Sequence, residues 1–370
     1  MTGSIVSKSR IPIFIVLFSI SIGTATPAPA ADNSAEKLAK ATDSLNKGKA
    51  KAAAAIARSV IADNPNNAQA HTTLGAALAS MVDDDNYDAA IEEEKTALKL
   101  DPNSYWARKF LGKIYTNLHK TDEAITVLTE ACSVNPCSYA ARRDLAIAQT
   151  TAGKNDEAMK SFRAAIQINP AKMDSHLKLS ALLVKTDNYK EAIAEARKAV
   201  KLDVSNPETH LALANAILAS GDKIASIEEY ENAMQANESK SYRNALTQAA
   251  ALSGLGWAFS VPNAGKKELS QAVSYQQQAI KMFPGYGPAY VRLAELLGRQ
   301  GKIKSAEAMY KNSVRLSQED AGVSTAYAKF LIKNGRSEEA RNLLKKVLEK
   351  TPNCKQASDA LAELNSEKAS

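Results

Sequence analysis

The residues of this 370-residue chain that could support catalysis or hold a metal are few and widely spaced. His71, His176 and His210 lie 34 or more residues apart, whereas two ligands on one helix need a spacing of three or four residues. The chain contains no phosphate-binding P-loop, no GxSxG nucleophile motif and no HExxH zinc motif. We therefore predict that the protein is not an enzyme and has no catalytic residues, no cofactor and no metal site.

One group of acidic residues deserves comparison with a calcium loop. Asp83, Asp85 and Glu94 have the spacing of EF-hand ligands, but Asp88 replaces the required glycine and Tyr87 occupies a ligand position. The interpretation we favour is a solvated turn whose acids lie near a helix N-terminus, where the helix dipole favours negative charge.

The cysteines are too few for a disulfide scaffold. Cys132 falls on the apolar stripe of a predicted helix and is expected to be a small core residue. A bond to Cys137 would require the chain to fold back after that helix, so whether these two are bonded is left open. Cys354 lies far along the chain.

A helical hairpin over residues 105–138 is the element around which the chain is organised. Two amphipathic stretches, about 105–118 and 122–134, each place apolar residues on one stripe at helical spacing. The polar segment between them is short enough for a tight turn, and Pro136 ends the second helix. Neither stripe can be covered by its partner alone, so the hairpin needs similar neighbours.

The small residues of this hairpin recur along the chain in steps of 34, with one step of 46. One series is Ala90, Ala124, Ala158, Ala192, Ser226, Ala272, Ala306 and Ala340, and a second is Ala97, Ala131, Ala165, Ala199, Ala233, Ala279, Ser313 and Val347. Small side chains suit positions where two helices cross closely. We therefore expect Ala124 and Ala131 to lie at helix crossings, and Ala141 to be exposed.

This pattern resembles the tetratricopeptide repeat, in which a Leu-Gly pair, a Tyr, two Ala and a Pro recur every 34 residues. The matching residues in the hairpin are Leu111, Gly112, Tyr115, Ala124, Ala131 and Pro136. The resemblance covers about residues 34–364 and implies an all-α, right-handed α-solenoid of helix-turn-helix repeats with a C-terminal capping helix.

The register divides the chain into a degenerate first repeat (31–67), a repeat array (68–354) and a capping helix with its tail (355–370). An insertion at 241–267 interrupts the array. We expect residues 241–248 to lengthen a first helix by about two turns and residues 261–267 to form a long hairpin loop. The insertion is either a tolerated irregularity or a protrusion for a partner.

The first 30 residues have the pattern of a secretory signal peptide. Lys8 and Arg10 precede an apolar stretch over 11–23, and Ala28-Pro29-Ala30 suits a signal peptidase. The alternative is an uncleaved N-terminal membrane anchor, but the apolar stretch is shorter than the ~20 residues that span a bilayer. We expect an exported, periplasmic or secreted protein with no stable membrane insertion after cleavage.

The net charge of +7 is mild for the length of the chain and falls to +5 without the two basic residues of the predicted signal peptide. Nucleic-acid-binding proteins usually concentrate basic residues in one patch or run, and no such run is present. We therefore do not expect a nucleic-acid partner.

The resemblance also implies a partner-binding groove lined by defined first-helix positions. The positions that match in this chain include Trp106, Lys109, Lys113, Asn117, Arg143, Leu177, Leu211, Asn215, Ser253 and Trp257. Both tryptophans fall on groove positions, and three cations lie beside Trp106. The order of Lys and Asn residues differs from the family's carboxylate clamp, so that function is not transferred.

These features predict a protein-interaction scaffold or adaptor in the cell envelope, whose groove binds an extended or helical protein segment with acidic and apolar residues. The alternative is a scaffold of a polysaccharide-export or peptidoglycan-linked envelope machine.

Overall fold

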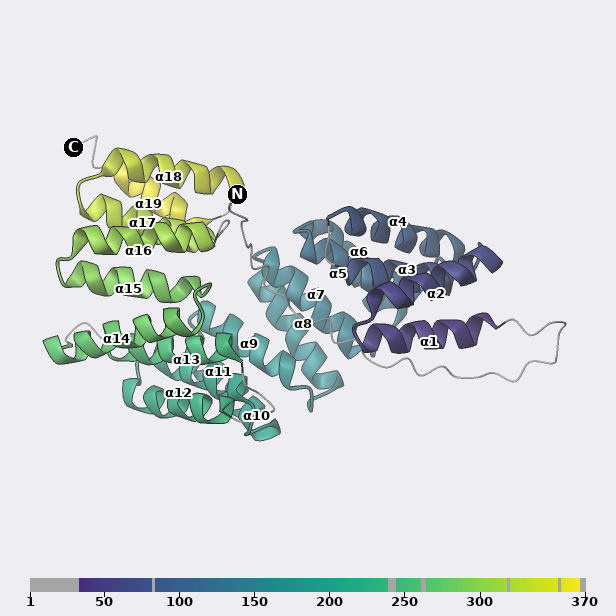
Figure 1. Cartoon of the computed structure of the whole chain (residues 1–370), viewed down its shortest axis with the longest axis horizontal. Coiled ribbons are helices and arrows are strands. Elements are labelled where there is room, and N and C mark those ends of the chain that lie inside the picture. The colour runs from purple at the N-terminus through teal and green to yellow at the C-terminus, as the bar shows by residue number, and fades with distance from the viewer. Residues whose placement is uncertain are drawn as a thin grey trace. The chain divides into compact units, whose positions relative to one another are not determined.

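The computed structural model describes residues 33–81, 84–238, 244–260, 264–317, 320–351 and 354–366, so the predicted signal peptide and Asp83 lie outside the described part. Within it, every regular element is an α-helix (Figure 1). The helices are α1 (Ser34–Asn46), α2 (Ala50–Asp63), α3 (Ala68–Ala79), α4 (Asp84–Leu100), α5 (Tyr105–Asn117), α6 (Thr121–Val134), α7 (Tyr139–Thr151), α8 (Asn155–Ile168), α9 (Met173–Lys185), α10 (Tyr189–Leu202), α11 (Pro207–Ala219), α12 (Lys223–Asn237), α13 (Ala245–Ala258), α14 (Lys266–Met282), α15 (Gly287–Arg299), α16 (Ile303–Leu316), α17 (Ala321–Lys333), α18 (Ser337–Lys350) and α19 (Lys355–Ser366).

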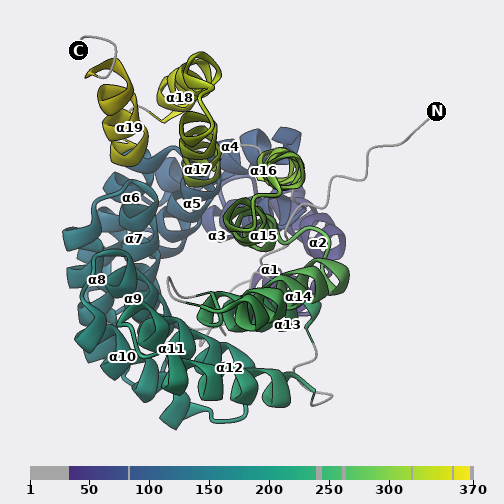
Figure 2. The same cartoon turned by 90° about the vertical axis from the view of Figure 1, so that its left-hand side faces the viewer.

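Consecutive helices pack as hairpins, for example α5 against α6 and α15 against α16, which Figure 2 shows side by side. The odd-numbered first helices also contact one another, α3 with α5 and α13 with α15. The chain divides into two compact units, Met1–Leu182 and Leu183–Ser370, with the division inside α9. In each unit the first helices therefore form one continuous layer, and α19 packs on α17 and α18 at the end. The fold is an all-α helical-repeat solenoid.

Small residues allow the helices of a pair to approach closely. Ala124 and Ala131 are completely buried, as predicted. At Gly112, an added Cβ would lie 2.4 Å from Cγ of Leu128 on the facing helix, so only glycine fits there. The recurring small residues therefore set the distance between the helices of each pair.

The first helices begin and end with local signals that the sequence carries. Ser104 and Ser138 accept hydrogen bonds from the backbone N–H groups of Ala107 and Ala141 and so cap α5 and α7. Most first helices end in a left-handed residue, usually glycine, but His119 follows α5 with a φ of 57°. A side chain in that conformation costs more than glycine does.

Two expectations about packing are wrong. Ala141 is completely buried, because it faces the core formed with Ala131, Cys132 and Leu145. Helix α13 begins at Ala245 after an Asn244 cap, ten residues before Leu255, whereas α5 begins six residues before Leu111, so α13 gains about one turn at its start rather than two. Part of the insertion is also helical in α14, which has 17 residues against 14 in α6. Residues 241–243 and 261–263 lie outside the described part.

The three cysteines are free: Cys132 is buried, Cys137 is exposed and Cys354 is half-buried. No disulfide therefore joins Cys132 to Cys137. None of the helices in the described residues is long and apolar enough to span a membrane.

Candidate functional site

A cation held against aromatic rings is the centre of the candidate site in the N-terminal unit. Lys109 and Trp106 lie on α5 with Phe110, and the Lys109 ammonium is 5.3 Å from the Trp106 ring centre and 4.9 Å from that of Phe110. Trp106 itself stacks on Phe110 with the ring centres 5.9 Å apart. Cation–π contacts of this kind are stronger when the cation is shielded from water, and the Lys109 side chain is only 12% exposed.

A buried acid from the next repeat joins this cluster. Asp144 on α7 is 6% exposed at its side chain, and its Oδ1 accepts hydrogen bonds from Nε and Nη2 of Arg143 at 3.0 and 2.7 Å. The Lys109 ammonium lies 4.0 Å from Oδ2 of Asp144. That oxygen has no hydrogen-bond partner among the described residues. Asp144 therefore attracts both Lys109 and Arg143, while its Oδ2 accepts no hydrogen bond from a described residue.

The lysines of this cluster are not fully neutralised by acids. Burial lowers the pKa of both Lys109 and Lys113, and neighbouring cations lower it further, against the attraction of Asp144. Lys113 forms no ion pair with any residue that the structure describes. Lys109, Lys113 and Arg143 share the buried Asp144, and of the three only Arg143 also lies near a second acid, Asp174, which leaves an excess of positive charge beside Trp106.

The surface continues onto α9 through polar contacts. Nε of Arg143 lies 3.7 Å from Oδ2 of Asp174, and the Tyr139 ring lies 5.8 Å from the Arg143 guanidinium. Ser175 donates a hydrogen bond of 2.9 Å to the Tyr139 hydroxyl. Arg143 therefore connects two acids, and Lys178 lies 3.8 Å from Oδ1 of the second of them, Asp174.

The remaining predicted residues are dispersed over the two units. Asn117 is exposed at the end of α5, and Leu177 is half-buried on α9. Leu211 packs against the core around Tyr230, and Asn215 accepts a hydrogen bond of 2.6 Å from the Tyr230 hydroxyl. Of the predicted residues, those that gather around Asp144 are thus Trp106, Lys109 and Lys113 on α5 and Arg143 on α7.

Trp257 on α13 is 38% exposed and has the Arg292 guanidinium 5.7 Å from its ring centre. Ser253, which we expected in the groove, is instead fully buried, because its hydroxyl donates to the side chain of Gln276 at 2.8 Å.

Sequence reasoning missed Asp144 and a pocket in the C-terminal unit. Asp144 directly follows a predicted groove position, and no pattern distinguishes it from an exposed acid. The pocket residues could have been found, because Glu295 and Lys329 occupy the same repeat position as Trp257. Applying the groove positions to the last two repeats would have identified them.

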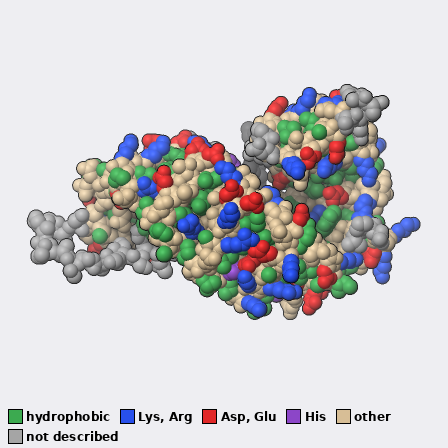
Figure 3. All heavy atoms as spheres, turned by 180° about the vertical axis from the view of Figure 1, so that it is seen from behind, with side chains coloured by type: hydrophobic (Ala, Val, Ile, Leu, Met, Phe, Trp, Pro, Cys, Tyr) green, Lys and Arg blue, Asp and Glu red, His purple; other side chains and the backbone are tan. Residues whose placement is uncertain are grey.

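On the face in Figure 3, basic and acidic side chains are interspersed and do not form one large block. The described residues also contain no group of three or more His, Cys, Asp or Glu side chains that could hold a metal ion.

Comparison with known proteins agrees with the repeat register. Family models described as tetratricopeptide repeat match residues 38–105 and 299–364, and a model described as the N-terminal TPR repeats region of Psidin matches residues 76–233. Models of tetratricopeptide repeats thus match three stretches of the chain, each shorter than half of it. No curated protein matches the chain.

Several solved structures align with part of the chain. MamA 41-end from Desulfovibrio magneticus RS-1 aligns with 20% identity and a TM-score of 0.42, over 48% of this chain and 98% of that one. A structure described as crystal structure of MamA protein aligns with 22% identity and a TM-score of 0.41, over 46% of this chain and 94% of that one. Each alignment thus covers less than half of this chain.

Proposed function

We propose that this chain is a non-enzymatic protein-interaction scaffold of the cell envelope, and that its α5–α7 surface binds an acidic protein segment with apolar side chains. The surface is defined by Trp106, Lys109, Lys113, Arg143 and Asp144. The tetratricopeptide fold supports a protein partner in general terms, and the side chains of this surface support its chemistry.

The observation that carries the proposal is the unneutralised positive charge of half-buried lysines beside an aromatic ring. Holding a cation away from water is unfavourable unless an acid compensates it. Lys113 forms no ion pair with a described acid, and burial lowers its pKa despite the attraction of Asp144. A carboxylate from a partner would supply the missing charge, and Trp106 and Phe110 would contact an adjacent apolar side chain.

Location in the envelope is supported by the N-terminal sequence pattern of residues 1–30, which lies outside the described residues. This part of the proposal depends on processing and export, and the binding surface does not depend on it.

Lys113→Glu is the most informative variant, because Lys113 is not needed to hold another residue in place. Arg143 is a poorer choice since it pairs with Asp144 and Asp174. The experiment compares wild type, Lys113→Glu and Lys160→Glu as bait in an envelope extract, with quantitative mass spectrometry of the bound proteins. Lys160 is exposed on the second helix α8 and controls for the charge change.

We expect at least one acidic protein to be depleted roughly tenfold on Lys113→Glu and retained on Lys160→Glu, and its purified acidic segment to bind wild type with the same preference. A partner that binds all three baits equally would contradict the proposed surface. Fractionation that leaves the protein in the cytoplasm with Met1 intact would contradict the envelope location alone.

A further inference from the structure

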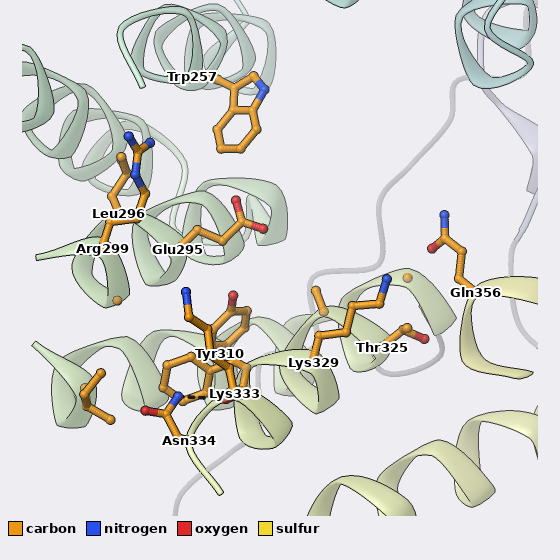
Figure 4. Close-up of a pocket in the computed structure, with 15 residues that line it drawn as sticks. Trp257, Glu295, Leu296, Arg299, Tyr310, Thr325, Lys329, Lys333, Asn334 and Gln356 are labelled. Carbon is orange, nitrogen blue, oxygen red and sulfur yellow. Dashed lines mark hydrogen bonds between the residues drawn. The ribbon is translucent and has the colours of Figure 1, made fainter. Parts of the chain in front are cut away.

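The C-terminal unit contains a pocket of about 630 Å³ between first helices of successive repeats. Trp257 comes from α13, Glu295 and Arg299 from α15, and Lys329 and Lys333 from α17 (Figure 4). This volume lies within the range of ordinary ligand pockets.

The wall of the pocket is aromatic. Tyr310 and Phe330 line it and are almost completely buried, with their ring centres 5.0 Å apart. Trp257, on another helix, lines the same space and is more than a third exposed. Exposed tryptophans beside a concave apolar surface are frequent binding anchors. The pocket can therefore accommodate one large apolar side chain against these rings.

The charged groups around the pocket are unbalanced. Lys329 and Lys333 are exposed, and neither forms an ion pair with another described residue. Glu295 is half-buried, and burial raises its pKa against the attraction of Arg292 and Arg299. Arg299 donates to the backbone oxygen of Ser260 at the end of α13, which holds its charge beside the pocket. The cations exceed the single acid, so the pocket favours an anionic partner.

From this combination we infer that the pocket is a second binding site, which takes an internal protein segment with an aromatic residue flanked by acidic residues. The aromatic side chain enters between Trp257 and Phe330. The flanking carboxylates pair with Lys329 and Lys333. This site uses other helices than the α5–α7 surface, and it does not depend on the function proposed for that surface.

Glu295 provides a specific test of the inference, because its negative charge should repel an acidic segment. A carboxylate inside the pocket repels an acidic segment and lowers its affinity, while Glu295→Gln keeps the shape and removes the charge. Loss of this acid should therefore tighten binding, whereas loss of Lys329 should weaken it. A pocket that does not bind the acidic segment would show neither effect.

The probe is a synthetic peptide with one phenylalanine flanked by glutamates, acetylated and amidated so that no terminal charge remains. Its binding is followed by tryptophan fluorescence in a Trp106→Phe protein, in which Trp257 is the remaining tryptophan. Anisotropy of a labelled peptide serves for the variants of Trp257, and a thermal melt accompanies each protein. Lys345→Glu on the second helix α18 is the matched control for Lys329→Glu.

We expect the peptide to change Trp257 fluorescence and to bind roughly thirtyfold more weakly to Trp257→Ala with a near-normal melt. Lys329→Glu should weaken binding roughly tenfold, Glu295→Gln should tighten it about threefold, and Lys345→Glu and Lys113→Glu should leave it unchanged.

Five results would overturn the inference. The first three are no fluorescence change at saturating peptide, equal binding of a peptide with alanine in place of phenylalanine, and equal losses for Lys329→Glu and Lys345→Glu. The fourth is binding only of a peptide with a free terminal carboxylate, because the pocket would then recognise a terminus. The fifth is equal binding of single-stranded DNA, because the pocket would then recognise charge alone.

Discussion

Glu94 on α4 should destabilise the N-terminal unit at neutral pH, and Glu94→Gln should therefore stabilise it. The Glu94 side chain is completely buried, and neither of its carboxyl oxygens has a hydrogen-bond partner among the described residues. Burial, opposed by the nearby Thr72 hydroxyl and helped by the charge of Glu93, raises the pKa of Glu94 well above its usual value of 4.5. Folding at pH 7 must therefore either bury a charge or bind a proton.

The chain itself shows how glutamine behaves at this position. Gln276 on α14 occupies the same place in its repeat as Glu94, four residues after the small residue Ala272 as Glu94 is after Ala90. It is also completely buried, but its Nε2 donates to the Ser253 backbone oxygen at 2.9 Å and its Oε1 accepts from the Ser253 hydroxyl. Thr72 is the residue that corresponds to Ser253 beside Glu94. Glu94→Gln can thus form equivalent bonds without a charge.

Relief of one buried unsatisfied polar group is worth about 1–3 kcal/mol. For a unit of this size that corresponds to a rise in Tm of about 2–4 °C per kcal/mol. The sign of the pH dependence follows from the raised pKa. The folded protein holds the Glu94 proton more tightly than the unfolded chain, so this contribution is fully present below about pH 4.5 and is lost as the pH rises. The advantage of glutamine should therefore appear at pH 7 and vanish near pH 4.

The assay is thermal unfolding by circular dichroism at pH 7 and pH 4, with Glu92→Gln as the control for removal of an exposed acid on the same helix. The reciprocal change Gln276→Glu should lower the Tm at pH 7. If Glu94→Gln is no more stable than wild type at pH 7, or keeps its advantage at pH 4, then Glu94 is not the buried, unsatisfied acid described here.

Three further predictions concern packing, a turn and processing. Ala124→Leu should lower the free energy of unfolding by about 1–3 kcal/mol in denaturant, because Ala124 is completely buried at a helix crossing. The control Ala181→Leu, at an exposed alanine, should change it by no more than about 0.5 kcal/mol. Equal effects of the two substitutions would contradict the repeat register. His119→Gly should stabilise the protein by about 1 kcal/mol in the same assay, since the left-handed φ of His119 suits glycine, and a loss of stability would mean that the side chain has another role. N-terminal sequencing of the exported protein should find a start near Ala31, and an intact Met1 in a membrane fraction would favour the anchor instead.

The repeat fold could be determined from the sequence because the information in a solenoid is local. Each repeat contacts only its neighbours, so the same small residues must recur at a fixed distance, as Ala124 and Ala158 do. The turn at His119 and the helix caps at Ser104 and Ser138 likewise depend on short stretches of chain. Ala141 was misjudged because it belongs to the first-helix face that packs on the preceding hairpin, and the small-residue series alone does not identify that face.

Tertiary structure alone decided how the polar side chains pair, because such pairing depends on side-chain directions across helices and on burial. Asp144 reads as an ordinary acid in the sequence, yet it is buried between Arg143 and Lys109 and leaves one oxygen unsatisfied. Ser253 and Glu94 were expected at a groove and in a solvated turn region, but both are completely buried. Equivalent positions of different repeats thus lie in the groove, in the core or in the pocket, depending on which side chains face them. Those facing side chains come from separate helices that only the folded chain brings together.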